Sequence, residues 1–186
     1  TAVGSSAGEE ITTGKFNTLI GGLTGDAITT GEQNVALGYA ALTTDDLGSH
    51  SVAIGPSALY AQNYATATNS YNTAVGSAAG GAITTGISNT LIGGLAGDAL
   101  TDADDNIAIG YRALTTNILG SRSVAIGNDA LYNQNPATAT AMYNTGVGFN
   151  AGNAVTTGIQ NTIIGGLAGD AMTTGDANTA IGYLSF

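Results

Sequence analysis

Short apolar segments that end in glycine recur along the whole chain. Each begins with Asn or Ser, continues with a β-branched residue, a residue that is usually Ala and a large aliphatic residue, and ends in Gly, as in Asn89–Gly93. Apolar residues here alternate with a period of two, which is typical of a β-strand, whereas a helix needs a period of 3.6. A helix would also lose about 1 kcal/mol at each glycine. The pattern therefore predicts an all-β fold of short strands separated by turns.

The segments are evenly spaced. They begin at Asn17, Asn34, Ser51, Asn72, Asn89, Asn106, Ser123, Asn144, Asn161 and Asn178, and Thr1–Gly4 is a partial copy. Most of them open a 17-residue unit, but Ser51 and Ser123 each open a 21-residue unit. Four units make a 72-residue super-repeat, so that Asn17, Asn89 and Asn161 are equivalent. Repeats at a fixed period are the signature of a solenoid, and each unit is therefore expected to form one rung of a parallel β-roll.

One continuous domain is expected over residues 1–186. It divides into super-repeat units 17–88, 89–160 and, in part, 161–186. The chain does not begin with Met, and it starts and stops inside a rung. Because the ends of solenoids are normally capped, we interpret it as an internal fragment of a longer fibrous protein.

Both faces of the predicted strands are apolar. With Asn or Ser as position 1, position 4 is always Ile, Leu or Val, and position 3 is mostly Ala, with Leu19, Leu91 and Ile163 as larger cases. Positions 2 and 4 share one face, and position 3 lies on the other. Strands that are apolar on both faces are typical of parallel sheets. We expect positions 2 and 4 inside the roll, with Ile92 and Ile109 in its apolar stack, and position 3 buried where three rolls pack around one axis as a homotrimer.

The remainder of each rung predicts turns and a short second strand. A further apolar residue such as Ile28 or Ile83 precedes a Thr-Thr-Gly segment, which would return the chain to the next Asn. Adjacent acidic residues such as Asp45 and Asp46 are expected to be solvated turn residues. Asn at position 1 is expected to form a structural ladder, because stacked Asn side chains hydrogen-bond along a parallel array. The ladder residues are Asn17, Asn34, Asn72, Asn89, Asn106, Asn144, Asn161 and Asn178.

Composition excludes several classes of function. The net charge is −10, with three basic and thirteen acidic residues, which argues against binding to nucleic acid or an anionic membrane. No apolar run is long enough to span a membrane, so no membrane insertion is expected. The chain has no Cys and a single His, so no catalytic Ser-His-Asp or Cys-His set can recur along the repeat. We therefore expect neither an enzyme nor a cofactor.

Two rungs carry a recognisable motif. Ser51–Ala58 and Ser123–Ala130 match the pattern Ser-Val-Ala-Ile-Gly-x-x-Ala, which resembles the head repeats of trimeric autotransporter adhesins. The longer rung, Asn-Thr-x-Ile-Gly-x-x-Ala-Gly-x-x-x-Thr-Thr-Gly, is similar to repeats of bacteriophage tail fibres. The resemblance covers the whole chain, although the 17-residue and 21-residue rungs are longer than the adhesin repeats. It implies a left-handed parallel β-roll, three chains around one axis, and attachment to a cell surface.

The function expected from this resemblance is a non-enzymatic structural and attachment segment of a trimeric viral tail fibre. It would be extracellular, on the virion, with other fibre or virion proteins and a host-cell surface glycan or protein as partners. The alternative is the head of a trimeric autotransporter adhesin on the bacterial outer surface. A more distant alternative is a repeat-array binder such as an ice-binding protein, but that needs an unbroken row of Thr. Thr12–Thr13 and Thr29–Thr30 are followed by Asp45–Asp46 at the equivalent place.

Candidate binding residues fall into two groups. Three acidic residues, Asp26, Asp98 and Asp170, recur at the same place in each super-repeat. They are weak candidates for ligands of a hard cation such as Ca²⁺, and the alternative interpretation is that they are solvent-facing turn residues. The 21-residue rungs are rich in Tyr, Asn and Gln, a composition suited to adaptable binding surfaces. The candidate receptor contacts in these rungs are Tyr60, Tyr64, Tyr71, Tyr132 and Tyr143. The alternative interpretation is that these rings only pack the loop against the rod.

Overall fold

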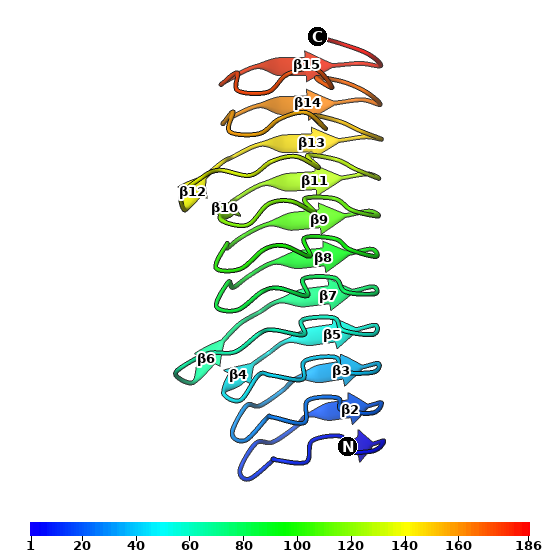
Figure 1. The fold of residues 1–186 in the computed structure, drawn as a ribbon, viewed down its shortest axis with the longest axis vertical. Helices are drawn as coiled ribbons and strands as arrows, with labels where there is room; N and C mark the ends of the chain where they lie inside the picture. The colour runs from blue at the N-terminus through cyan, green and yellow to red at the C-terminus, as the bar shows by residue number, and fades with distance from the viewer.

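The chain forms a rod of stacked rungs, described from residue 1 to residue 186 in a computed structural model (Figure 1). It is an all-β parallel solenoid of about eleven rungs. Eleven strands, one per rung, make a single sheet: β1 (Ala2–Val3), β2 (Thr18–Ile20), β3 (Val35–Leu37), β5 (Val52–Ile54), β7 (Thr73–Val75), β8 (Thr90–Ile92), β9 (Ile107–Ile109), β11 (Val124–Ile126), β13 (Thr145–Val147), β14 (Thr162–Ile164) and β15 (Thr179–Ile181). All strand pairings in this sheet are parallel and join sequential rungs.

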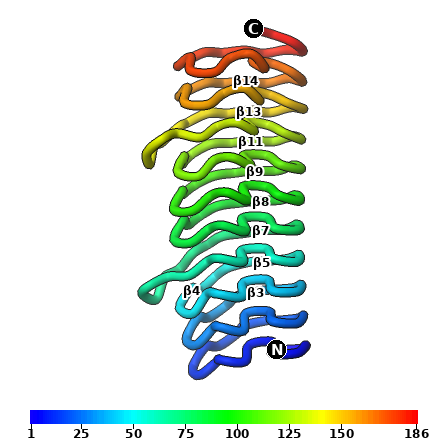
Figure 2. Tube along the Cα trace, in the orientation of Figure 1, coloured from blue at the N-terminus to red at the C-terminus, as the bar shows by residue number.

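The register of the sheet confirms the two rung lengths. Leu19 lies opposite Ala36, its equivalent one 17-residue unit later, whereas Ala53 lies opposite Ala74, its equivalent one 21-residue unit later. The four extra residues of a long rung are therefore accommodated outside the sheet. Two small sheets form there: β4 (Gly48–Ser49) pairs with β6 (Thr68–Asn69), and β10 (Gly120–Ser121) pairs with β12 (Thr140–Ala141). Figure 2 shows these segments protruding from one side of the rod at two levels.

The expected second strand around Ile28 and Ile83 is not formed, and the strands of the two small sheets lie later in the rung, where the chain returns to the next position 1. Elsewhere the half of the rung that follows position 5 consists of turns and bends. Its backbone repeatedly enters the left-handed region, as at Leu23 (φ 55°) and Gly25 (φ 54°), and such residues interrupt an extended conformation. The prediction of a short second strand around Ile28 and Ile83 was therefore wrong, although both side chains are buried.

Glycine at position 5 is required by both its backbone angle and its neighbours. Gly21 has φ of +136°, which L side chains rarely adopt, and a Cβ added there would lie 2.5 Å from the carbonyl oxygen of Gly38 in the next rung. Equivalent glycines repeat this close approach along the rod. Position 5 thus lets the rungs stack at the spacing of adjacent strands, about 4.8 Å.

The two faces of the sheet are assigned oppositely to the sequence prediction. Position 3 points into the roll: Leu19, Ala36, Ala53 and Leu91 are fully buried. Position 4 points outward, and Ile92 is 38% exposed. The roll interior is narrow, which suits the mostly small position 3, whereas the larger aliphatic residues of position 4 need the room outside. The assignment of Ile92 and Ile109 to the interior stack was wrong.

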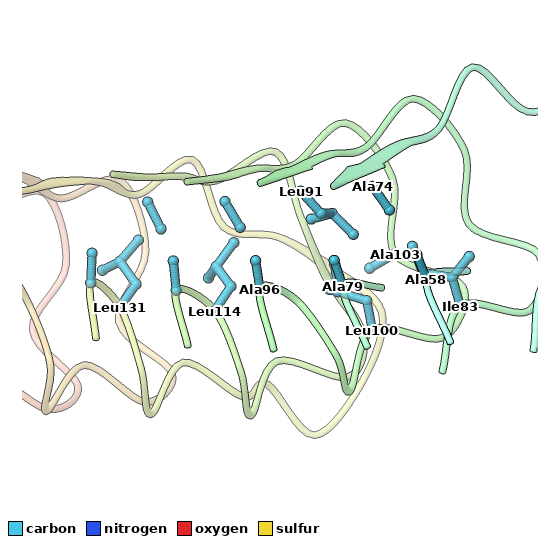
Figure 3. Close-up of a cluster of buried hydrophobic side chains, with 14 of the residues drawn as sticks. Ala58, Ala74, Ala79, Ile83, Leu91, Ala96, Leu100, Ala103, Leu114 and Leu131 are labelled. Carbon is cyan, nitrogen blue, oxygen red and sulfur yellow. The ribbon is translucent and has the colours of Figure 1, made fainter. Parts of the chain in front are cut away.

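Core side chains are matched in volume across the rung. Where position 3 is large, as at Leu19, position 9 is Gly, and a Cβ on Gly25 would lie 2.9 Å from a methyl group of Leu19. In most rungs where position 3 is Ala, as at Ala36, position 9 is Leu, as at Leu42, whereas the rung of Ala74 has Gly80 there. Figure 3 shows Leu91, Leu114 and Leu131 lying along the core among alanine side chains. Close packing of this kind leaves little tolerance for a change in volume.

Complementary volumes also connect neighbouring rungs. Gly146 stands at position 3 of a rung in which position 9 is Gly as well, and Leu131 of the preceding rung occupies the space, 2.8 Å from a Cβ added at Gly146. Four rungs are needed before the arrangement returns, which gives the 72-residue super-repeat a physical reason in core packing.

Leu91→Ala is expected to lower the free energy of unfolding by about 2–5 kcal/mol, because Gly97 across the rung has no side chain to fill the cavity. Urea unfolding followed by circular dichroism measures the change. Leu23→Ala serves as the matched control, because Leu23 is 36% exposed, and its effect should stay below about 1 kcal/mol. Equal losses in the two variants would contradict the assignment of position 3 to the core.

Candidate functional site

The asparagine ladder is present, but its main partners are backbone groups, namely a carbonyl near the end of the same rung and the N–H that opens the next rung. The Asn34 backbone N–H donates to Oδ1 of Asn17 at 2.9 Å, and Nδ2 of Asn17 donates to the carbonyl oxygen of Gly31 at 2.8 Å. The same pair of bonds recurs at Asn34, Asn89 and Asn106, among others. Side-chain to side-chain bonds are fewer and longer, as between Asn89 and Asn72 at 3.3 Å. Each amide therefore satisfies a buried carbonyl near the end of its own rung and a buried N–H at the start of the following rung, which supports a structural role for these residues.

A glutamine completes the ladder where Ser replaces Asn. Nε2 of Gln62, from the same long rung, donates to Oγ of Ser51 at 2.7 Å, and Oε1 of Gln62 accepts from Nδ2 of Asn72 at 2.9 Å. Gln134 joins Ser123 to Asn144 in the same way. Both glutamines are fully buried. The shorter Ser leaves room for the Gln side chain, so the pair replaces one ladder Asn.

Asp45 is a buried carboxyl, not the solvated turn residue expected from the sequence. Its side chain is fully buried, and it accepts hydrogen bonds from Gln62 Nε2 at 2.6 Å and from the Gly48 backbone N–H at 3.0 Å. Burial raises the pKa of Asp45 to about 6, although these hydrogen bonds oppose the change. The equivalent residue in the next super-repeat is Asn117, which accepts from the Gly120 backbone N–H at 2.9 Å. Burial of the first Asp of this pair depends on the neighbouring Gln, which the local sequence alone does not indicate.

Tyr64 is also buried, so it is not available as a receptor contact. It is 5% exposed; its hydroxyl donates to the carbonyl oxygen of Gly86 at 2.9 Å and accepts from Nδ2 of Asn72 at 3.2 Å. Burial raises the pKa of Tyr64. The equivalent position in the next super-repeat is Pro136, also buried. The expectation that Tyr64 lies on the surface was wrong: it anchors the long rung to the ladder.

Three of the remaining candidate tyrosines are paired with other side chains. Tyr71 stacks on His50 with ring centroids 5.2 Å apart. The guanidinium of Arg122 lies 5.8 Å from the ring centroid of Tyr143 and donates to its hydroxyl at 3.2 Å. His50 and Arg122 occupy equivalent positions, so this contact is repeated in both long rungs. The third, Tyr132, also lies beside an arginine.

Tyr132 and Tyr60 occupy equivalent positions but have different surroundings. The Arg112 guanidinium lies 4.9 Å from the Tyr132 ring centroid and forms two hydrogen bonds of 2.8 Å with Asp129. Tyr60 is 46% exposed, and Ala40 stands at the position equivalent to Arg112. Tyr60 therefore presents a ring that no cation covers.

The three recurring aspartates do not form a cation site by themselves. Asp26 and Asp98 each accept a hydrogen bond from a threonine hydroxyl of the next rung, Thr43 and Thr115 respectively. Asp170 is half-buried near the end of the rod. No group of three or more His, Cys, Asp or Glu side chains is placed to hold a metal ion. The contacts favour a role in joining rungs for Asp26 and Asp98.

The outward face of the sheet carries an aliphatic row along its whole length. We define the outer face as the side chains at positions 2 and 4 of the eleven-stranded sheet. Position 4 forms an unbroken aliphatic row: Val3, Ile20, Leu37, Ile54, Val75, Ile92, Ile109, Ile126, Val147, Ile164 and Ile181. Position 2 mixes Thr with Val and Ile, and no charged residue lies at either position. The Thr row needed by an ice-binding array is therefore interrupted, for example at Val35 and Ile107.

Exposed aromatic residues beside the outer face were missed from the sequence. Tyr39, Tyr111 and Tyr183 follow the position-5 glycine and are 63%, 50% and 73% exposed. A Cβ added at Gly94 would lie 3.6 Å from the Tyr111 ring, so the ring packs over glycine of the preceding rung. Their recurrence at one place of the 72-residue super-repeat could have identified them.

Helices of the length and apolarity needed to cross a membrane are absent from the chain.

Asp45→Asn should make stability at this site independent of pH between about 4 and 6. The carboxyl has a pKa of about 6 in the folded chain and 3.8 as its ordinary value. Its stabilising contribution is therefore full below about pH 4 and is lost as the pH rises through about 6. A difference of about two pKa units corresponds to roughly 3 kcal/mol. The Asn side chain faces a second donor, Gln62 Nε2, at every pH, so the expected result is a difference in melting temperature, variant minus wild type, that is more favourable to the variant at pH 7 than at pH 4.

Thermal unfolding at both pH values measures this difference. Asn117→Asp provides the reciprocal variant, because it introduces a carboxyl at the equivalent buried position and should lower the melting temperature at pH 7. If the difference between wild type and Asp45→Asn does not change with pH, Asp45 is not a titrating buried carboxyl.

Comparison with known protein families, with curated proteins and with solved structures finds no match to this chain.

Proposed function

We propose that this segment is the shaft and attachment region of a homotrimeric extracellular fibre, most simply a bacteriophage tail fibre, with a non-enzymatic role. The observation that carries the proposal is the outer face. It is an unbroken aliphatic row on a flat parallel sheet, with Ile92 38% and Leu37 42% exposed. By strand spacing the row is about 50 Å long. A continuous apolar surface of this extent is typical of an interface.

A second and third copy of the chain are the partners that fit this face. The row repeats at the strand spacing, so a matching partner needs the same repeat, and identical chains in parallel register supply it. The net charge of −10 resides outside positions 2 and 4, so association there buries no charged residue. Closed threefold packing covers the face on every chain and prevents sideways polymerisation. The left-handed roll and threefold axis implied by the adhesin-like motif agree with this arrangement.

The long rungs suit an attachment role because they project at two levels of the rod (Figure 1). Tyr60, Tyr71 and Tyr143 are exposed there, and loops held by a rigid scaffold commonly carry recognition. Partners would be a host-cell surface glycan or protein and other fibre or virion proteins. The Ser51–Ala58 motif also supports the head of a bacterial trimeric surface adhesin as a second candidate. Electron microscopy of labelled full-length protein on virions or on bacterial cells separates the two.

Ile92→Asp should abolish association while the single roll stays folded, because the carboxylate would be desolvated between chains but solvated on a free chain. Light scattering of the wild type should give about three times the 18.2 kDa mass of one chain. Circular dichroism checks that the variant keeps its β-structure. Thr85→Asp, which adds the same charge at an exposed turn, should remain associated.

A wild-type chain that remains monomeric at micromolar concentration would contradict the trimer. If Ile92→Asp loses its β-structure and Thr85→Asp keeps it, position 4 lies in the interior of the roll and the outward assignment is wrong.

A further inference from the structure

A shallow groove of about 350 Å³ crosses three consecutive rungs on the turn segments that follow the strands. Ser57, Tyr60, Ala78, Gly81, Ala82 and Asp98 line it. Tyr60 belongs to the first long rung, Ala78, Gly81 and Ala82 to the next rung, and Asp98 to the third. No residue at position 2 or 4 lines the groove, so its lining does not belong to the face proposed to pack in the trimer.

The groove is open because three positions carry small residues. At the equivalent places in the next super-repeat, Ala61, Ala78 and Gly81 are replaced by Asn133, Asn150 and Asn153. There Nδ2 of Asn133 donates to the carbonyl oxygen of Asn153 at 2.9 Å, and Nδ2 of Asn153 donates to that of Asp129 at 3.4 Å. The same scaffold is therefore filled by amides at one level and left open at the other.

The walls of the groove offer an aromatic ring and hydrogen-bonding oxygens. Tyr60 is 46% exposed, whereas the equivalent Tyr132 is covered by Arg112. Asp98 is half-buried, and only its Oδ1 is engaged by the Thr115 hydroxyl, which leaves Oδ2 to accept from a ligand. An aromatic face binds the C–H groups of a pyranose by apolar contact, and a carboxylate accepts hydrogen bonds from its hydroxyls. The small floor lets a flat ring approach the backbone closely.

Charge decides which sugars fit. None of the three basic residues, Lys15, Arg112 and Arg122, lines the groove, and Asp98 would repel an acidic sugar. We propose that this groove is a binding site for a neutral saccharide, with Tyr60 as the stacking platform and Asp98 as the hydroxyl acceptor. The proposal rests on the attachment function proposed above and names its ligand class and its site.

The test uses saturation-transfer NMR of the whole chain with methyl glycosides of glucose, galactose and mannose, and with N-acetylneuraminic acid as the anionic comparison. A site of this size should bind at least one neutral glycoside with a Kd on the order of 1 mM. Tyr60→Ala should weaken that binding at least about tenfold, which is the loss expected for one stacking contact.

Filling the groove is the sharper variant. Ala78→Asn combined with Gly81→Asn installs two of the three asparagines of the next super-repeat, and Asn tolerates the positive φ of 53° at position 78 better than Ala does. This variant should lose binding while keeping its melting temperature. Tyr132→Ala, the matched control, should bind as the wild type does.

The proposal is overturned if no neutral glycoside binds at tens of millimolar, if the filled variant binds unchanged, or if the anionic sugar binds best. Light scattering on the same samples separates the two proposals. A trimer that binds no sugar contradicts the saccharide site but not the trimeric fibre. A monomer that binds sugar contradicts the trimeric fibre but not the saccharide site.

Discussion

Hydrogen bonding between successive rungs is the interaction on which the rest of this protein depends. A rung has no strand partner within itself, so its backbone groups must be satisfied by the rungs on either side. The strand register supplies part of this and the turns supply more, as in the bond from the Gly25 N–H to the carbonyl oxygen of Ala41 at 3.0 Å. Asn at position 1 provides the remaining contacts by spanning from one rung into the next. Stability is therefore a property of neighbouring pairs of rungs.

Core volume sets the longer period. A single rung is too narrow for large side chains at both position 3 and position 9, so Leu and small residues alternate between them, as at Leu19 with Gly25 and Ala36 with Leu42. The first long rung adds a different solution, in which its buried Gln62 forms a hydrogen bond with the buried Asp45 of the preceding rung in place of an apolar contact. Each level that carries a projecting loop therefore also carries a buried Gln, so loop insertion and core chemistry are coupled there.

Much of the architecture was predictable from the sequence, because rung length, strand position and parallel order follow directly from the recurring 17-residue and 21-residue units. The recurrence of Asn89 and its equivalents predicted a ladder of stacked amide side chains, whereas the main partners of these amides are backbone groups. The direction of the faces was not, since positions 3 and 4 are both apolar and only the width of the roll decides between them. Asp45 is buried where it contacts Gln62, and Tyr64 is buried where it contacts Gly86. Each partner lies in the next rung, so the local sequence around Asp45 or Tyr64 does not indicate the contact. The Tyr60 groove is open because Ala78 and Gly81 stand where the next super-repeat has Asn, and the recurring motif does not specify these positions.

Alignment of the inter-rung hydrogen bonds with the rod has a mechanical consequence. Bonds between parallel strands run across the strands, hence along the length of this rod, so a pull between its two ends loads them in tension and not in shear. All bonds at one level share the load, and the weakest level sets the strength of the whole. Ser51 and Ser123 have no side-chain amide to bond to the next rung. Gln62 and Gln134 supply that amide, and their Oε1 atoms accept hydrogen bonds of 2.9 Å from Nδ2 of the next ladder Asn. The buried glutamines therefore keep a side-chain hydrogen-bond connection between rungs at the two levels where a loop is inserted and Ser replaces Asn.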